Sequence, residues 1–560
     1  MWATVPAWTT DTMETAAADQ GRDEGGSGSA ASRRAGAGWR LVQRALPFIV
    51  LAAVITHPTQ VTVRQWADAL ANLLGFGRGL ARFVPGVRIC VSELLLLGGF
   101  VLWLAVTLRE GRLGARLRRY PPALLAFLGC AVLSAVPFLK PPAMFTGRQL
   151  LYGRALTEFV QLCVLFVCGY LVLADLMDEE RWRRRLVAAF LCAAGLAVLV
   201  GLAEYARLRP LAVPGGGGAA GVALQEVSSG AIVSPVTVDG TFGFVAEPAG
   251  PHEQAGTSSN RNVLGAWASL VVPLFWGLAM CLKRPAVRAL CGLGAAGGLL
   301  LLLHGGLWFA TLLALLVMAY VAGRRTFAVT ALGLFAFWAV VFSLFPERHG
   351  AVLLDSVMLR KGYDRFYTLP LYGGGRPKLD EPPAALRAED NSVWQQKYVE
   401  WQPGLQALAR NALFGVGLGN YQSNIGAFYE PRPDPLLNPD GVYAVRKPTA
   451  NLMESGANSF YLVRLVETGF AGLFAFLWVL MSGLRGAAAG CRGAGDWERG
   501  LALGSLGALA AMGVGMLFTD YIVRGVGVAV VFVLAAAAAA GNRAARAQPA
   551  GPANGARGAV

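Results

Sequence analysis

The chain has 560 residues, of which 55% are hydrophobic and only 15% are charged. A soluble chain of this length would form several domains and carry far more charge, so the composition predicts a polytopic membrane protein. The net charge of +15 could indicate a nucleic-acid partner. However, the arginines gather in short segments between apolar stretches, which follows the positive-inside rule. We therefore expect a lipid bilayer and no nucleic acid as partners.

Twelve apolar stretches come near the length that spans a bilayer. They cover residues 43–57, 89–108, 122–139, 157–176, 185–204, 263–281, 286–303, 306–322, 327–345, 459–482, 500–518 and 522–540. The expected fold is therefore all-α, a polytopic membrane helical bundle with about 12 transmembrane helices and one large periplasmic loop.

This pattern divides the chain into five segments. We expect a disordered cytoplasmic tail over 1–42, nine spans over 43–345, a large and partly helical periplasmic loop over 346–457, three spans over 458–541 and a disordered cytoplasmic tail over 542–560. The first tail is polar and holds Asp and Glu, so it does not fit a cleaved signal peptide. Arginines such as those at 181–185 and 324–325 place both termini in the cytoplasm and the loops 205–262 and 346–457 outside.

Two charged residues, Arg464 and Glu467, lie inside the tenth span, NSFYLVRLVETGFAGLFAFLWVL. A charged side chain near the bilayer centre costs about 2.5–3.5 kcal/mol on insertion scales, so such residues usually face a protein interior or a watery cavity. Because they are three positions apart, they are neighbours on one helical face. The pair predicts either a donor-phosphate or acceptor site, or a buried ion pair that joins neighbouring helices.

The long loop contains EDNSVWQQKYVEWQPGLQALARN, which opens on a helix-capping signal and predicts an amphipathic helix. It runs into FGVGLGNYQ, where Gly415, Gly417 and Gly419 permit tight turns or close backbone approach to a ligand. This glycine run follows a helix rather than a strand, so it is not a dinucleotide fingerprint, and the chain has no GxxxxGK[ST] phosphate loop. The spacing of Cys and His indicates no metal site, and we expect no cofactor.

Three segments carry a resemblance to a known family. In chain order they are NRNVLGAWASLVVPL, FGVGLGNYQ and ETGFAGLFAF. Their order resembles the O-antigen ligase and polymerase superfamily of bacterial envelope glycan enzymes, over about residues 89–541. The resemblance implies a metal-independent glycosyltransferase of the GT-C type in the bacterial inner (cytoplasmic) membrane. Such enzymes pass a glycan from an undecaprenyl diphosphate carrier to an acceptor hydroxyl, on lipid A core or on another glycan, at the periplasmic face.

The chain departs from the superfamily at three motif positions. The span after the long loop usually begins with His-Asn-x-x-Leu, whose histidine is a proposed general base, but this chain has Asn458, Ser459 and Leu462. A usual Ser-Arg-Gly step becomes His304, Gly305 and Gly306. A usual Arg-x-x-x-Trp becomes Lys397 and Trp401. Asparagine cannot take a proton near neutral pH, so another group must act as base, or catalysis is lost.

Together these observations define the candidate site. The candidate catalytic residues are Arg464, Glu467 and His304, and the candidate substrate-binding residues are Asn260, Arg261, Asn262, Lys397, Trp401, Gly417, Gly419 and Asn458. Arg261 could contact the diphosphate or anchor the interface, and His304 could replace the missing base or bond to backbone. Two other functions stay open: a catalytically silent scaffold of polysaccharide assembly, and a secondary transporter whose ion site is the charge pair.

Overall fold

The computed structural model describes residues 30–59, 90–118, 120–135, 159–207, 258–302, 305–344, 401, 404–409, 411–419, 421, 459–492, 495–522 and 526–547. These residues form helices and turns, with no β-strand among them. The chain divides into two units, Met1–Ala45 and Leu46–Val560. The described part of the first unit belongs to the beginning of α1 (Ala30–Thr56).

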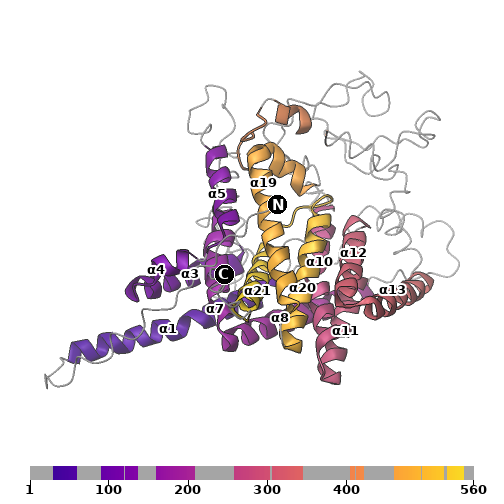
Figure 1. The fold of residues 1–560 in the computed structure, drawn as a ribbon, viewed down its shortest axis with the longest axis horizontal. Coiled ribbons are helices and arrows are strands. Elements are labelled where there is room, and N and C mark those ends of the chain that lie inside the picture. Colours follow the sequence, from indigo (N-terminus) through magenta and orange to yellow (C-terminus); the bar gives the residue numbers. More distant parts are fainter. Residues whose placement is uncertain are drawn as a thin grey trace, which may run out of the picture. The chain divides into compact units, whose positions relative to one another are not determined.

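The second unit contains the remaining helices (Figure 1). In chain order they are η1 (His57–Thr59), α3 (Val91–Arg109), α4 (Leu113–Leu117), α5 (Pro122–Ala135), η4 (Val164–Gly169), α7 (Tyr170–Asp178), α8 (Glu180–Arg207), α10 (Ser258–Cys281), α11 (Pro285–Leu300), α12 (Gly305–Ala322), α13 (Arg324–Leu344), α19 (Phe460–Gly490), α20 (Asp496–Gly515) and α21 (Val526–Ala547). Of these, η4 is a π-helical turn that leads directly into α7. The predicted all-α class is thus confirmed over the described residues.

Seven of the described helices are long and apolar enough to cross a membrane. They are Val91–Arg109, Phe159–Asp178, Glu180–Ala203, Val263–Cys281, Arg324–Leu344, Phe460–Gly490 and Val526–Ala547. Four of the other predicted spans correspond to shorter apolar helices, Leu41–Thr56, Pro122–Ser134, Pro285–Leu300 and Gly306–Ala322, and the stretch 500–518 corresponds to α20. A membrane protein is therefore confirmed, while the count of twelve spans and the side on which each loop lies stay predictions.

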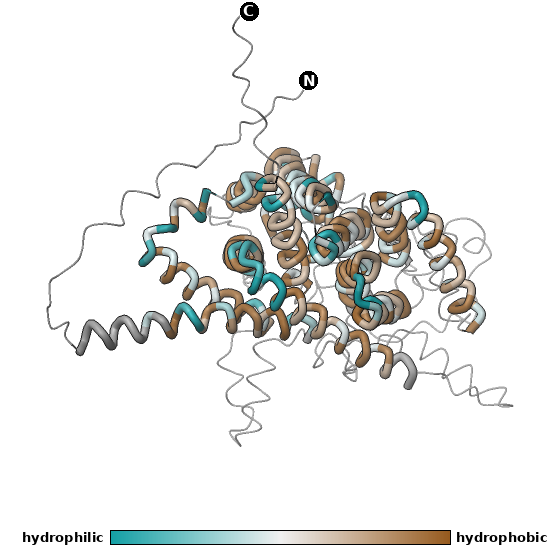
Figure 2. The backbone as a smooth tube through the Cα atoms, turned by 60° about the horizontal axis from the view of Figure 1, so that its bottom comes forward, coloured by the Kyte–Doolittle hydropathy of each residue, from teal (hydrophilic) through white to brown (hydrophobic). Residues whose placement is uncertain are grey.

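The outer surfaces of these helices are apolar. In α13, Leu332 and Phe335 are 70% and 74% exposed, and brown predominates along most of the helical tube in Figure 2. An apolar surface of this extent is unfavourable in water but suits contact with lipid chains. The exposed side chains therefore support a bilayer as the surroundings of the helices.

The helices of the second unit pack closely around α10, α20, α19 and α21. The helix α10 packs along α20, and α19 packs against α21, α5 and α20. Where α10 crosses α20, a Cβ atom placed on Gly277 would lie 2.5 Å from the backbone nitrogen of Gly504. Small residues at such crossings let membrane helices approach backbone to backbone. This packing fixes α20, and hence the turn that follows it, beside α10 and α19.

Candidate functional site

The tenth predicted span, α19, begins with a cap and is interrupted in its middle. The Ser459 side chain accepts a hydrogen bond from the backbone N–H of Leu462, which defines the start of the helix. At Gly469 the backbone leaves the helical conformation, with φ 68° and ψ −172°. Glycine adopts this combination readily, and residues with a Cβ atom rarely do. The site is built around this break.

The break removes two hydrogen bonds from α19. The four backbone groups that it leaves open bond instead to residues 412–417 of the long loop. In a regular helix the N–H groups of residues 470 and 471 would donate to the carbonyls of residues 466 and 467. Here those carbonyls accept from Val416 and Gly417, each at 2.8 Å. The N–H groups of Phe470 and Ala471 donate instead to the carbonyls of residues 412 and 413, at 2.8 and 3.2 Å. Residues 412–417 therefore satisfy the backbone groups that the interrupted helix leaves open, as a membrane interior requires.

The predicted glycine turns are confirmed in this loop. Gly415, Gly417 and Gly419 have φ values of 70°, 97° and 73°. A Cβ atom on Gly415 would lie 2.4 Å from the carbonyl oxygen of Val466. The close backbone approach that the glycines permit is thus made to α19. A role for Gly417 and Gly419 in binding substrate stays a prediction.

The chain around this loop also packs against the first half of α19 through apolar side chains. A buried cluster joins the two segments, with Trp401 partly buried against it; its members are Ala407, Leu408, Tyr421, Leu462 and Val466. Residues 404–409 are helical, which agrees with the end of the predicted amphipathic helix. Trp401, a candidate substrate-binding residue, thus packs beside α19.

Three charged residues form a network next to the break. The Nη1 atom of Arg464 lies 2.7 Å from Oε2 of Glu467, and its Nη2 atom lies 3.5 Å from Oδ2 of Asp520. The Arg464 and Glu467 side chains are only 4% and 3% exposed, whereas Asp520 is 33% exposed. These three side chains carry one positive and two negative formal charges. The contact expected from the spacing of Arg464 and Glu467 is present.

The loop and the network are joined through Glu467. Its Oε1 atom accepts a hydrogen bond from the backbone N–H of Tyr421 at 3.3 Å, and its backbone carbonyl accepts from Gly417. On the other side, the guanidinium carbon of Arg464 lies 5.1 Å from the ring centroid of Phe460. The network is thus held by α19 itself and by the loop that docks on it.

Asp520 lies in the turn between α20 and α21, and this turn contacts both α19 and α10. Its Oδ1 atom accepts from the backbone N–H of Ile522 at 2.9 Å. The N–H of Phe460 in α19 donates to the carbonyl of Met516 at 2.9 Å, and the hydroxyls of Ser269 in α10 and Tyr521 lie 2.7 Å apart. Sequence reasoning missed Asp520. The available signal was a lone acidic residue, in LFTDYIV, between two apolar stretches.

The structure describes the other candidate site residues only in part. His304, Lys397 and Asn458 lie outside the described residues. The backbone of residues 260–262, which include Arg261, lies in the first turns of α10, and their side chains lie outside the described part. The structure therefore brings together Arg464, Glu467, Gly417 and Trp401, and adds Asp520. Within the described ranges no group of three His, Cys, Asp or Glu residues is placed to hold a metal ion.

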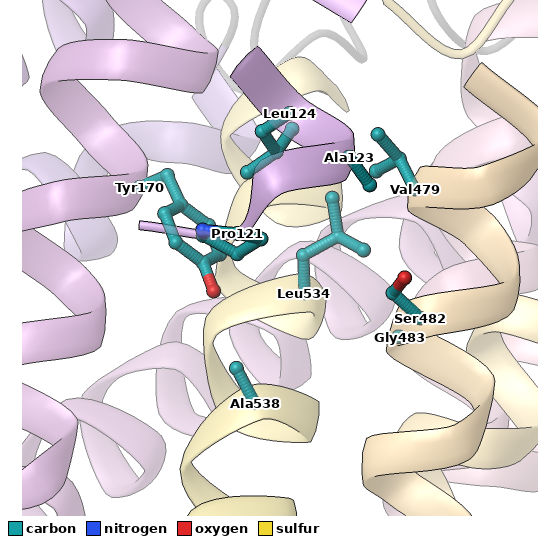
Figure 3. Close-up of a pocket in the computed structure, with 9 residues that line it drawn as sticks. All are labelled: Pro121, Ala123, Leu124, Tyr170, Val479, Ser482, Gly483, Leu534 and Ala538. Atoms are coloured by element: carbon teal, nitrogen blue, oxygen red, sulfur yellow. The ribbon is translucent and has the colours of Figure 1, made fainter. Parts of the chain in front are cut away.

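An apolar cavity lies elsewhere in the same unit, between α5, α7, α19 and α21 (Figure 3). Its volume is about 60 Å³, and its lining comprises Pro121, Ala123, Leu124, Tyr170, Val479, Ser482, Gly483, Leu534 and Ala538. Ligand pockets usually measure about 300–1,000 Å³. On α19, the lining residue Val479 lies beyond the break at Gly469, and none of the lining residues belongs to the charged network. The cavity is too small for a ligand pocket and does not include the charged site.

No model of a known protein family matches this sequence, and no curated protein matches it either. The resemblance to the O-antigen ligase and polymerase superfamily therefore rests on the three short segments and their order.

Proposed function

We propose that the protein is a membrane glycosyltransferase of the O-antigen ligase and polymerase type. It moves a glycan from an undecaprenyl diphosphate carrier to an acceptor hydroxyl at the periplasmic face of the bacterial inner membrane, in lipopolysaccharide or exopolysaccharide assembly. One observation carries the proposal: two of the segments that bear the resemblance, the glycine loop and α19, meet at one charged network, and the segment in α10 contacts Tyr521, the neighbour of Asp520. Convergence of sequence-distant polar groups inside a membrane bundle is typical of a functional site.

The contacts of the three segments support this assignment. The glycine loop bonds to α19 at the break, and α19 supplies Arg464 and Glu467. The first segment, NRNVLGAWASLVVPL in α10, reaches the turn after α20 through the contact between Ser269 and Tyr521, which is next to Asp520. The chain lacks a phosphate loop, which fits a donor that arrives already activated as a lipid diphosphate.

The chemistry requires cations for the leaving diphosphate, and we assign this part to Arg261. Arginine binds phosphate oxygens with two parallel hydrogen bonds, and fixed cations stabilise the charge that develops on a leaving group. Arg464 already faces Glu467 and Asp520, and the three together carry a formal charge of −1. A guanidinium that already faces two carboxylates is less available to a diphosphate. We therefore assign Arg464 to positioning the two carboxylates.

A purified transfer assay tests the proposal. The protein in detergent is given an undecaprenyl diphosphate-linked glycan and an acceptor glycan in the presence of EDTA, and the product is measured by mass spectrometry. We expect full turnover in EDTA, and a loss of about 100-fold or more in Arg261→Ala, because one stabilising group is worth about 10²–10³ in rate. Arg288→Ala, an exposed arginine on α11, is the matched control and should keep full activity. Unchanged turnover in Arg261→Ala would remove the assigned diphosphate site.

A second candidate function is favoured by the partners of Arg464. Arg464 and Glu467 form an ion pair with each other, which favours a structural role for both. Such a role is expected in a catalytically silent protein that binds carrier-linked glycan and scaffolds polysaccharide assembly. The two functions differ in cells. For a transferase, removal of the protein leaves glycan on its carrier, and the double variant Arg261→Ala/Arg464→Ala does the same. For a scaffold, removal disturbs assembly while the double variant makes wild-type product. Unchanged glycan with lost solute uptake would instead indicate a transporter.

A further inference from the structure

The three members of the charged network differ in their access to solvent. Arg464 and Glu467 are almost fully buried between α19 and the docked loop, whereas Asp520 is one-third exposed. Asp520 lies at the end of the bundle where α19 begins, since the turn that holds it accepts the backbone N–H of Phe460. A small group that approaches the network from this end therefore meets the carboxylate of Asp520 first.

Contacts with two described residues orient the Asp520 carboxylate. Its Oδ1 atom accepts from the N–H of Ile522 within its own turn, and its Oδ2 atom faces Nη2 of Arg464. A carboxylate has about four lone-pair sites and acts as an acceptor in its ionised form. Asp520 is thus a carboxylate held in one orientation at the edge of a buried site.

The rest of the network acts as a support for this carboxylate. Arg464 contacts Asp520, Glu467 contacts Arg464, and the backbone of Tyr421 contacts Glu467. Each contact links the next element in a series that runs from the long loop, through α19, to the turn between α20 and α21. Support of a reacting group by neighbours that are themselves held in place is a general requirement of active sites. In this arrangement Arg464 and Glu467 are positioning residues.

We infer that Asp520 is the general base of the proposed transfer, an inference that rests on the function proposed above. The acceptor hydroxyl gives its proton to the Asp520 carboxylate while its oxygen forms a bond to the anomeric carbon of the donor sugar. The bond between that carbon and the phosphate oxygen breaks, and its electron pair leaves with undecaprenyl diphosphate. The protonated Asp520 then gives its proton to water. This assigns to Asp520 the part that Asn458 cannot take.

The decisive variant is Asp520→Asn, measured in the purified transfer assay. The asparagine side-chain oxygen can still accept from Ile522, so the turn keeps its hydrogen bond while the side chain loses its basicity. We expect kcat to fall by about 100-fold or more with little change in KM, since general base catalysis contributes about 10²–10⁴ in rate. Asp520→Glu retains a carboxylate and should keep at least tenfold more turnover than Asp520→Asn. Asp496→Asn removes a carboxylate that pairs with Lys283 at the other end of α20, and should leave turnover unchanged.

The outcomes separate this inference from the proposed function. Wild-type transfer together with near wild-type kcat in Asp520→Asn would overturn the base assignment and leave the proposed function standing. Equal losses of kcat in folded Asp520→Asn and Asp520→Glu would show that the position needs the size of aspartate rather than a carboxylate. That result would also overturn the base assignment. Thermal unfolding in detergent shows whether Asp520→Asn folds. If it does not, the folded Asp520→Glu variant decides the question. A turnover of Asp520→Glu below about one-hundredth of the wild-type value would then refute the assignment. No transfer by the wild-type protein would overturn both proposals.

Discussion

The break in α19 should depend on the absence of a side chain at Gly469, and Gly469→Ala tests this. A residue with a Cβ atom at this φ and ψ costs about 1–3 kcal/mol in backbone strain. The new Cβ atom would also lie 2.2 Å from the carbonyl oxygen of Leu413 and 2.5 Å from the nitrogen of Phe414. Both are backbone atoms, so the contact is relieved only when the loop moves away.

Release of the loop gives up four backbone hydrogen bonds and allows α19 to close two of its own. At about 0.5–1.5 kcal/mol net for each bond, the exchange favours the docked loop by roughly 1–3 kcal/mol in the wild-type chain. The strain from alanine is of the same size and opposite sign. Since about 1.4 kcal/mol corresponds to a factor of ten, docking should weaken by roughly 5- to 150-fold before the steric contact with Leu413 is counted.

Amide hydrogen exchange of the purified protein in detergent measures this equilibrium. The amides of Val416 and Gly417 should exchange faster in Gly469→Ala by the same factor, because their exchange requires the loop to leave α19. The matched control is Gly333→Ala on α13, where an added Cβ atom has no neighbour within 4 Å. Equal protection of both amides in wild type and Gly469→Ala would refute the account of the break.

Three further results are expected. Glu467→Gln leaves the buried Arg464 with one fewer counter-charge and should destabilise the protein by about 3 kcal/mol in thermal unfolding, whereas Glu180→Gln breaks only an exposed pair with Arg184 and should change stability by less than about 1 kcal/mol. Gly504→Ala places a Cβ atom 2.8 Å from the backbone of Leu274 and should cost about 1–3 kcal/mol, while Gly292→Ala, which meets open space, should be neutral or slightly stabilising. An alkaline phosphatase fused near Gly375 should be active in cells and one fused near Gly490 inactive; the reverse pattern would invert the topology.

The sequence was sufficient for features that depend on local spacing. Apolar stretches predicted the helices, and the three-residue spacing predicted that Arg464 and Glu467 meet on one face. The glycines of FGVGLGNYQ predicted tight turns, which residues 415–419 adopt. These features follow from residues close together in the chain, so no knowledge of the packing was needed.

The break at Gly469 and the role of Asp520 could not be predicted in this way. Hydropathy treats ETGFAGLFAF as one continuous span, because a glycine among apolar residues does not interrupt the average. Whether Gly469 is helical depends on hydrogen bonds from residues 412–417, more than fifty positions earlier. Likewise, Asp520 meets Arg464 only because α20 and α21 pack beside α19. Both features are products of long-range packing.

The placement of Arg464 and Glu467 one turn apart on the same helix also bears on how the protein is made. Synthesis proceeds from the N-terminus, so α19 is translated and leaves the ribosome before Asp520 does. An arginine that entered alone would add about 2.5–3.5 kcal/mol to insertion, but Glu467 accompanies it and provides a counter-charge within the same helical turn. The residues that close the broken backbone, 412–417, have already been translated by then. Insertion of this helix thus needs only residues made before it or with it, and the two helices that follow can be added to a segment whose charges and backbone are already satisfied.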